Sequence, residues 1–131
     1  MTPLTVLAVD DEPHALEDLA ELLADLPEID EVRTASEASE ALAQMAREHF
    51  DAVFLDVRMP GMSGTELARV LQRFADPPAL VFVTAHEDAA IEAFDLSAID
   101  YVLKPVSAAR LRQTVDRIVA ARGGAPPEDR R

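Results

Sequence analysis

Apolar residues gather in short continuous runs that are separated by stretches of helical period. Runs of strand length cover residues 4–9, 52–55, 80–83 and 101–103, and a weaker one surrounds Val32. Continuous rather than alternating runs are typical of parallel strands that are covered on both faces. The pattern therefore predicts five strands of a parallel sheet.

Between these runs, apolar residues recur at intervals of three and four, as on one face of a helix. The periodic positions are Leu16, Leu19, Leu22, Leu23 and Leu26; Ala38, Ala41, Leu42 and Met45; Leu67, Val70, Leu71 and Phe74; and Leu111, Val115, Ile118 and Val119. Ser63, with Glu66 three residues on, fits a capping box, and Ser107 can cap the last helix. Strand and helix thus alternate five times, which predicts an open α/β sheet with right-handed crossovers.

The length bounds the number of domains. The chain has 131 residues, of which 49% are hydrophobic, enough for one domain with a core. The run from Gly123 to Asp129 is rich in glycine, proline and charge, and it interrupts the helical pattern. We expect one domain over residues 1–122, followed by a linker or tail over 123–131.

Charge and composition limit the classes of partner and of chemistry that we expect for this chain. A formal net charge of −13 disfavours direct binding of nucleic acid or of an anionic membrane surface by this stretch. No apolar run approaches the length of a membrane span, and the first residues carry no basic, apolar signal region. The absence of cysteine excludes thiol catalysis and zinc–thiolate sites. We expect a cytoplasmic protein.

The polar residues that carry chemistry come directly after the apolar runs. Asp10 and Asp11 follow the first run, Asp56 the third, Thr84 the fourth and Lys104 the fifth. The carboxyl ends of parallel strands share one edge, where ligands bind in open α/β sheets. Lys104 is also the only lysine among twelve basic residues, so a compact ammonium group is used here and nowhere else.

If Asp10, Asp11 and Asp56 converge, the three carboxylates need a cation or must become protonated. At about 5 Å and an effective dielectric constant of ~20, each pair of charges repels by roughly 3 kcal/mol. Carboxylate oxygens suit Mg²⁺, which shares its coordination with phosphate oxygens. Asp10 and Asp11 are therefore candidate metal ligands and Asp56 a candidate nucleophile. Lys104 and the Thr84 hydroxyl are candidates to hold phosphoryl oxygens.

Four motifs carry a resemblance to a known family. They are Val9-Asp10-Asp11-Glu12, the run from Leu55 to Gly64 with Asp56 and Arg58, Val83-Thr84-Ala85, and Tyr101-Val102-Leu103-Lys104-Pro105. In this order, over residues 4–121, the chain resembles the CheY-like receiver domain of two-component response regulators. The resemblance implies a flavodoxin-like, doubly wound five-stranded parallel sheet of order 2-1-3-4-5 with five helices.

The resemblance also implies a mechanism. A sensor histidine kinase would present a phosphohistidine, Asp56 would take its phosphoryl group with Mg²⁺ as cofactor, and water would later remove it. The metal would be bound directly by Asp11, Asp56 and the backbone carbonyl of Arg58, and by Asp10 mainly through water. Thr84 would then move toward the phosphoryl group and Tyr101 would turn inward. The face formed by the fourth helix, fifth strand and fifth helix would change shape. Such a domain is a signalling phosphoacceptor rather than a metabolic enzyme.

The segment from Ala90 to Pro105 looks especially like receivers that carry a LytTR-type DNA-binding domain. By that resemblance the output is transcription, and DNA is contacted by an effector domain outside this chain. A stand-alone receiver that acts through protein–protein contacts is the alternative.

The charges of the last two helices suggest self-association. The fourth helix is acidic and the fifth basic, so the two could pair across a two-fold axis in a homodimer. The residues concerned are Glu87, Asp88, Glu92 and Asp95, and Arg110, Arg112, Arg117 and Arg122.

Two rival functions fit less well. A haloacid-dehalogenase-like Mg²⁺-dependent phosphatase would carry a second aspartate two residues after Asp56, where this chain has Arg58. A nucleotide- or flavin-binding domain would need a glycine-rich loop after the first strand, and none of the four glycines lies there.

Arg58 and His86, each two residues beyond a site residue, flank the approach of water to Asp56 and are candidates to shape dephosphorylation.

Overall fold

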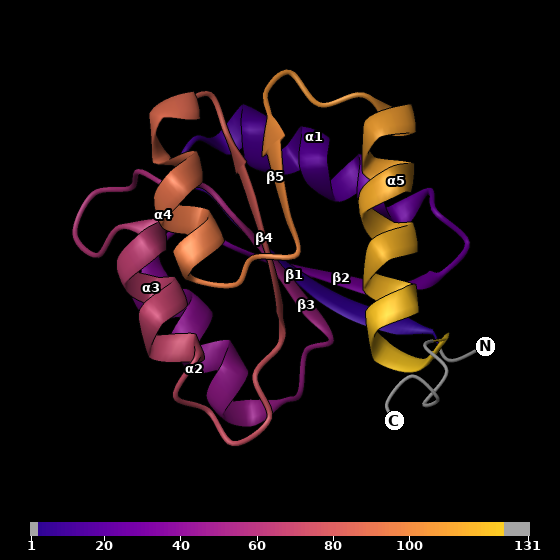
Figure 1. The fold of residues 1–131 in the computed structure, drawn as a ribbon, viewed down its shortest axis with the longest axis horizontal. Helices are drawn as coiled ribbons and strands as arrows, with labels where there is room; N and C mark the ends of the chain where they lie inside the picture. Colours follow the sequence, from indigo (N-terminus) through magenta and orange to yellow (C-terminus); the bar gives the residue numbers. More distant parts are fainter. Residues whose placement is uncertain (1–2, 125–131) are drawn as a thin grey trace.

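A computed structural model of the chain describes residues 3–124 (Figure 1). One parallel sheet of five strands forms the centre, in the order β2-β1-β3-β4-β5. This confirms the predicted sheet and its strand order. The strands are β1 (Leu4–Val9), β2 (Ile29–Ala35), β3 (Ala52–Leu55), β4 (Ala79–Thr84) and β5 (Asp100–Leu103).

Five α-helices connect and follow the strands, as predicted. They are α1 (Pro13–Ala24), α2 (Ala38–Arg47), α3 (Gly64–Leu71), α4 (Ala90–Asp95) and α5 (Ala108–Val119). A 3₁₀ turn, η1 (Glu87–Ala89), precedes α4, and a π turn, η2 (Ala120–Gly124), continues α5. Residues 125–131, most of the expected linker, lie outside the described residues.

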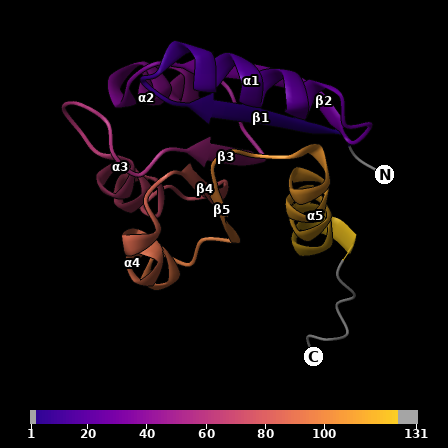
Figure 2. The ribbon, with the colours of Figure 1, turned by 90° about the horizontal axis from the view of Figure 1, so that it is seen from above.

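The sheet separates two apolar clusters. One packs α2, α3 and α4 against one face and includes Phe82 and Leu67, while the other packs α1 and α5 against the opposite face and includes Phe54 and Leu111. All four of these side chains are fully buried. Seen from above, α4 and α5 lie on either side of β5 (Figure 2). The two-sided burial explains why β1, β3 and β4 are continuously apolar.

The sequence pattern differs from the structure mainly at helix ends. Phe74 continues the apolar period of α3, yet the helix ends at Leu71, and two short turns carry the chain on to Phe74. Leu26 likewise follows α1. Both side chains still pack against the core, so apolar periodicity extends past a helix wherever the next turn covers the same cluster.

The helix starts are set by local capping. Ser63 and Glu66 form the predicted capping box at α3, and the Ser107 hydroxyl accepts a hydrogen bond from Arg110 N at α5. At α1 the cap is Glu12, whose carboxylate accepts from Ala15 N at 2.7 Å. Because Glu12 satisfies this helix end, the neighbouring Asp10 and Asp11 are not needed for it.

Among residues 3–124, no helix has the length and apolar character needed to cross a membrane.

Candidate functional site

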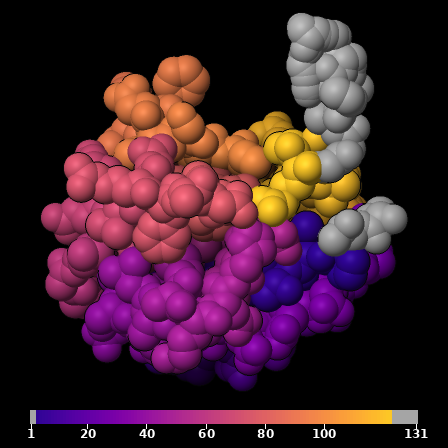
Figure 3. Space-filling model, turned by 90° about the horizontal axis from the view of Figure 1, so that it is seen from below, coloured from indigo at the N-terminus to yellow at the C-terminus, as the bar shows by residue number. Residues whose placement is uncertain are grey.

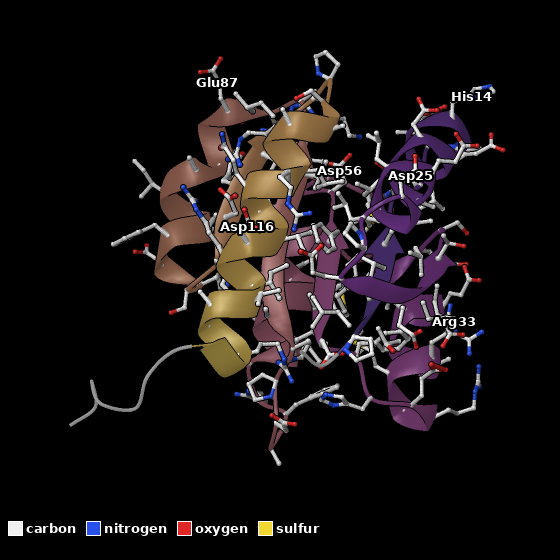
Figure 4. All side chains as sticks on the ribbon, turned by 90° about the vertical axis from the view of Figure 1, so that its right-hand side faces the viewer. His14, Asp25, Arg33, Asp56, Glu87 and Asp116 are labelled. Carbon is white, nitrogen blue, oxygen red and sulfur yellow. The ribbon has the colours of Figure 1, made fainter. Side chains whose placement is uncertain are left out.

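The carboxyl ends of the strands bring four predicted residues to one edge. Asp10 follows β1, Asp56 follows β3, Thr84 ends β4 and Lys104 follows β5. Asp56 lies at the end of β3 between the helical layers (Figure 4). The sheet order places β1, β3, β4 and β5 side by side, so residues far apart in sequence meet here.

Lys104 joins the two buried carboxylates. Its ammonium Nζ donates to Asp10 Oδ2 at 2.7 Å and to Asp56 Oδ2 at 2.9 Å. Asp10 and Asp56 are only 3% and 8% exposed. Burial by itself lowers the pKa of Lys104, but the hydrogen bonds to Asp10 and Asp56 outweigh it and raise that pKa above its usual value. The cation that the paired carboxylates require is thus supplied by the only lysine of the chain.

Backbone amides orient the remaining carboxylate oxygens. Asp10 Oδ1 accepts from Glu12 N at 3.0 Å, and Asp56 Oδ1 accepts from Arg58 N at 3.4 Å. Each aspartate is therefore held on one side by Lys104 and on the other by the loop that follows its own strand. This pre-orients the Asp56 carboxylate without immersing it in apolar surroundings.

Gly64 allows α3 to start directly against Asp56. Its N–H donates to Val57 O at 2.8 Å, and an ideal Cβ at this position would lie 1.8 Å from the backbone oxygen of Asp56. No side chain fits in that space. The glycine therefore determines how closely the helix approaches the candidate nucleophile.

Asp11 does not take part in the hydrogen-bonded cluster of Asp10, Asp56 and Lys104. Its side chain is exposed and makes no hydrogen bond or ion pair to the described residues. Among residues 3–124, no three histidine, aspartate or glutamate side chains are grouped as they stand for a metal ion. The structure brings Asp10, Asp56 and Lys104 together, and the ligand set with Asp11 and Arg58 stays a prediction. The available donors, carboxylate and carbonyl oxygens, are those that Mg²⁺ prefers.

Thr84 is fully buried beside this cluster. Its hydroxyl accepts a hydrogen bond from His86 N at 3.2 Å, and its carbonyl accepts from Lys104 N at 2.9 Å. The end of β4 is thus bonded both to the chain that carries Lys104 and to the segment that leads into α4.

Tyr101 reaches the same segment from β5. Its half-buried ring lies 6.2 Å from Phe82 between centroids, and its hydroxyl donates to the backbone oxygen of His86. Burial raises the pKa of Tyr101, which favours the protonated hydroxyl that donates this bond. The inward turn of Tyr101 on phosphorylation stays a prediction.

His86 contacts three of the predicted residues, Arg58, Thr84 and Tyr101. Nothing in the sequence indicated that one residue joins them. Besides its contacts to Thr84 and Tyr101, its Nδ1 lies 3.0 Å from Arg58 Nη1. A guanidinium group only donates, so Nδ1 is the acceptor in this contact. Arg58 Nη2 also forms an ion pair with Asp88 Oδ2 at 2.6 Å. The sequence spacing placed Arg58 and His86 near the site but carried no signal for Asp88.

The loop of Lys104, Pro105 and Val106 forms one wall of a groove next to the site. The Lys104–Pro105 peptide bond is cis. The groove, about 420 Å³ in volume, lies between α1 and this loop, and Asp10, Glu12, His14, Lys104 and Pro105 contribute to its walls.

Comparison with known proteins shows the family. The sequence matches the response regulator receiver domain over residues 6–116, most of its length. It is 36% identical over 119 residues to the transcriptional regulatory protein LytR of Staphylococcus aureus, an alignment that covers 91% of this chain and 48% of that protein. The chain thus spans about half the length of the curated relatives it matches.

Solved structures of receiver domains also resemble this chain. The response regulatory domain of mrkE from Klebsiella pneumoniae superposes with a TM-score of 0.83 at 32% identity, covering 90% of this chain and 97% of that one. The response regulator TrrA of Thermotoga maritima, solved in complex with Mg²⁺ and BeF, gives a TM-score of 0.78 at 31% identity, covering 90% and 99%. The chain belongs to the response regulator receiver domain family, and its fold is CheY-like.

Membership of this family confirms a signalling domain of the two-component type. Nothing supports the haloacid-dehalogenase-like phosphatase, because the position that would hold its second aspartate is Arg58, whose side chain is bound to His86 and Asp88.

Proposed function

We propose that this domain accepts a phosphoryl group on Asp56 from the phosphohistidine of a sensor histidine kinase. The observation that carries the proposal is the Lys104 ammonium group, which bridges Asp10 and Asp56 at the edge where parallel sheets bind ligands. An Asp56 oxygen attacks phosphorus, the bond from phosphorus to the histidine nitrogen breaks, and its electron pair stays on the imidazole.

The residues around Asp56 have distinct roles in this step. Lys104 holds one Asp56 oxygen before transfer and can exchange it for a phosphoryl oxygen, because its flexible stem allows a small movement. The Thr84 hydroxyl, which accepts from His86 N, has its own proton to donate to another phosphoryl oxygen. Tyr101 senses a movement of Thr84 through His86, to which both are bonded.

Asp10, Asp11, Asp56 and the backbone carbonyl of Arg58 would bind Mg²⁺. When bound, the ion would neutralise charge on the phosphoryl oxygens. The oxygen donors at the strand ends support this assignment, as does the complex of the related TrrA with Mg²⁺ and BeF. Lys104 binds only one oxygen of each carboxylate, so the other oxygen of Asp56 could bind the ion directly and Asp10 could bind it mainly through water.

The output is transcription through a LytTR-type DNA-binding domain outside this chain. The similarity to LytR over half of that protein's length supports this assignment. The domain itself is strongly acidic and does not contact DNA, and a cytoplasmic location fits this role. If it instead acts as a stand-alone receiver, the same switch would serve a protein–protein contact.

Phosphorylation would promote a homodimer through the face formed by α4, β5 and α5. Ile91, Phe94 and Leu103 on this face are 79%, 83% and 45% exposed, which supports an apolar contact. The predicted pairing of charges has less support, because Asp88, Glu92 and the four arginines of the α5 segment already form ion pairs within the chain.

One experiment tests the phosphoacceptor directly. Wild type and Asp56→Ala are incubated with Mg²⁺ and acetyl phosphate, and their intact masses are compared. Wild type should gain one phosphoryl group, and Asp56→Ala should gain none. Omitting Mg²⁺ should abolish the gain. Equal labelling of the two proteins, or of neither, would overturn the proposal.

A further inference from the structure

The helix α4 is weakly packed into the domain. It has six residues, only Ala93 of them is buried, and its two large apolar side chains, Ile91 and Phe94, are mostly exposed. The orange segment that includes α4 projects from the surface (Figure 3). Within the helix itself, apolar burial therefore contributes less than in α3, which buries five residues, and the nearest further buried apolar residue is Leu96, directly after α4.

Polar contacts along the segment also hold it. Asp88 accepts from Arg58 at 2.6 Å, Glu92 accepts from Arg69 at 2.5 Å, and the carbonyl of Leu96 accepts from the amide nitrogen of Gln72. Asp88 lies in η1, Glu92 in α4 and Leu96 directly after α4, so the three contacts are distributed from the start to the end of the segment.

All three partners come from the chain that follows Asp56. Arg58 lies in the loop after β3, Arg69 lies in α3, and Gln72 caps the end of α3. We call these three contacts the α3–α4 clasp. In Figure 1, α3 lies next to the lower part of α4.

We propose that the α3–α4 clasp determines the resting position of α4 and couples it to the loop after Asp56. Arg58 belongs to both structures, because its N–H binds Asp56 Oδ1 and its guanidinium binds Asp88. A displacement of this loop should therefore shift the position of α4, and a displacement of α4 should shift the loop. The proposal concerns the unphosphorylated protein, so it stands independently of phosphoryl transfer.

Each contact of the clasp is individually weak. The ion-paired side chains are 41% to 68% exposed, and an exposed pair shifts an opening equilibrium by about two- to fivefold. Because the contacts are spread along the segment, their free energies should add. The loss of two contacts should therefore shift the opening equilibrium by the product of the two single shifts. This graded strength suits an element that must hold its position and yet be released.

Hydrogen exchange tests the clasp without phosphate or metal. Asp88→Asn and Glu92→Gln each remove one ion pair while keeping the side-chain shape. Each should raise the exchange rate over residues 87–97 by about two- to fivefold, and the double variant by about the product. Exchange over residues 57–62 should rise with it, since the loop loses its anchor.

Glu87→Gln is the matched control. Glu87 lies in the same acidic turn, makes no ion pair with the described residues and points outward at the tip of the segment (Figure 4). Its substitution removes the same charge from the helix start and should leave exchange unchanged. If the double variant exchanges over residues 87–97 as the control does, the clasp does not hold α4. If α4 alone responds and residues 57–62 do not, the coupling is wrong.

Discussion

At the scale of single residues, Asp56 and Asp100 are buried aspartates that basic side chains stabilise at opposite ends of the parallel strands. Asp56, at the carboxyl edge, shares the single ammonium of Lys104 with Asp10. Asp100, at the start of β5, accepts two hydrogen bonds from Arg110, at 2.9 and 2.8 Å, and one from Thr114 at 2.7 Å. The first arrangement can exchange partners, and the second fixes α5 to β5.

Replacing Lys104 by arginine should preserve charge and impair switching. A planar fork cannot take the place of a compact ammonium that lies 2.7 and 2.9 Å from two carboxylates, and it is too large to fit beside phosphate and Mg²⁺. Losing one charge-assisted bond to the phosphoryl group should reduce the switched fraction on the order of tenfold.

Fluorescence can report this switch, because Tyr101 is the only tyrosine and the chain has no tryptophan. The fluorescence change of Tyr101 on adding acetyl phosphate and Mg²⁺ is measured, with intact mass to confirm that both proteins are phosphorylated. A wild-type response from Lys104→Arg would remove the special role assigned to this lysine.

Asp100 should make stability depend on pH in the acid range. Burial by itself raises the pKa of Asp100, but the hydrogen bonds from Arg110, Thr114 and the Tyr101 amide outweigh it and lower the pKa to about 2. Because the folded pKa lies below the unfolded value, the stabilisation is present above about pH 4 and is lost as the pH falls through about 2.

We expect wild type to exceed Asp100→Asn in free energy of unfolding by on the order of 2 kcal/mol at about pH 7, with the difference roughly halved by about pH 3. Urea unfolding at both pH values measures it. A difference that is the same at both pH values would show that charge on Asp100 is not the cause.

At the scale of elements, α3 and α4 are held in position by different kinds of contact. The capping box of Ser63 and Glu66, the close approach at Gly64 and five buried residues determine the position of α3. The position of α4 depends on exposed ion pairs. The well-packed helix α3 thus starts next to Asp56, the proposed phosphoacceptor, and the less buried helix α4 lies on the face that we propose to change shape.

Gly64→Ala should displace the backbone of Asp56. The added Cβ would lie 1.8 Å from the Asp56 carbonyl oxygen, so the loop or the helix must shift, at a cost of about 1 to 3 kcal/mol. Phosphorylation by acetyl phosphate, followed by intact mass, should slow together with the loss of stability seen in urea unfolding.

Gly61→Ala is the control for this prediction. Gly61 has a φ of 79°, and an added Cβ would meet nothing within 4 Å, so the substitution should cost stability through backbone conformation alone. Equal phosphorylation rates for Gly64→Ala and Gly61→Ala would contradict the role assigned to Gly64.

At the scale of the whole molecule, a net charge of −13 coexists with an exposed apolar patch formed by Ile91, Phe94 and Leu103. Charge repulsion keeps copies apart, and the patch favours their association. A modest change in the shape of the α4–β5–α5 face could therefore decide between monomer and dimer.

Light scattering tests this balance. Wild type treated with acetyl phosphate and Mg²⁺ should approach twice its monomer mass, and the untreated protein should stay monomeric. Phe94→Ser should weaken the dimer by about 2 kcal/mol per subunit, since the ring is the most exposed apolar group of the patch, while leaving phosphorylation intact. A wild-type protein that is monomeric in both states would rule out activation-linked dimerisation.

Apolar period and capping are local properties, so the five strands and four of the helices could be predicted from the pattern of residues alone. The edge at which Asp10, Asp56, Thr84 and Lys104 meet follows from the parallel arrangement of those strands. Strand order came from the resemblance to a family and was confirmed by the structure.

Which side chains touch depends on the tertiary fold. There Lys104 binds Asp10 and Asp56, while Asp11 makes no hydrogen bond to the described residues. His86 joins Arg58, Thr84 and Tyr101, and Asp88 binds Arg58. These partners are 2 to 94 residues apart in the chain. Their contacts depend on how the crossovers bring separate loops together, which no local pattern of residues records.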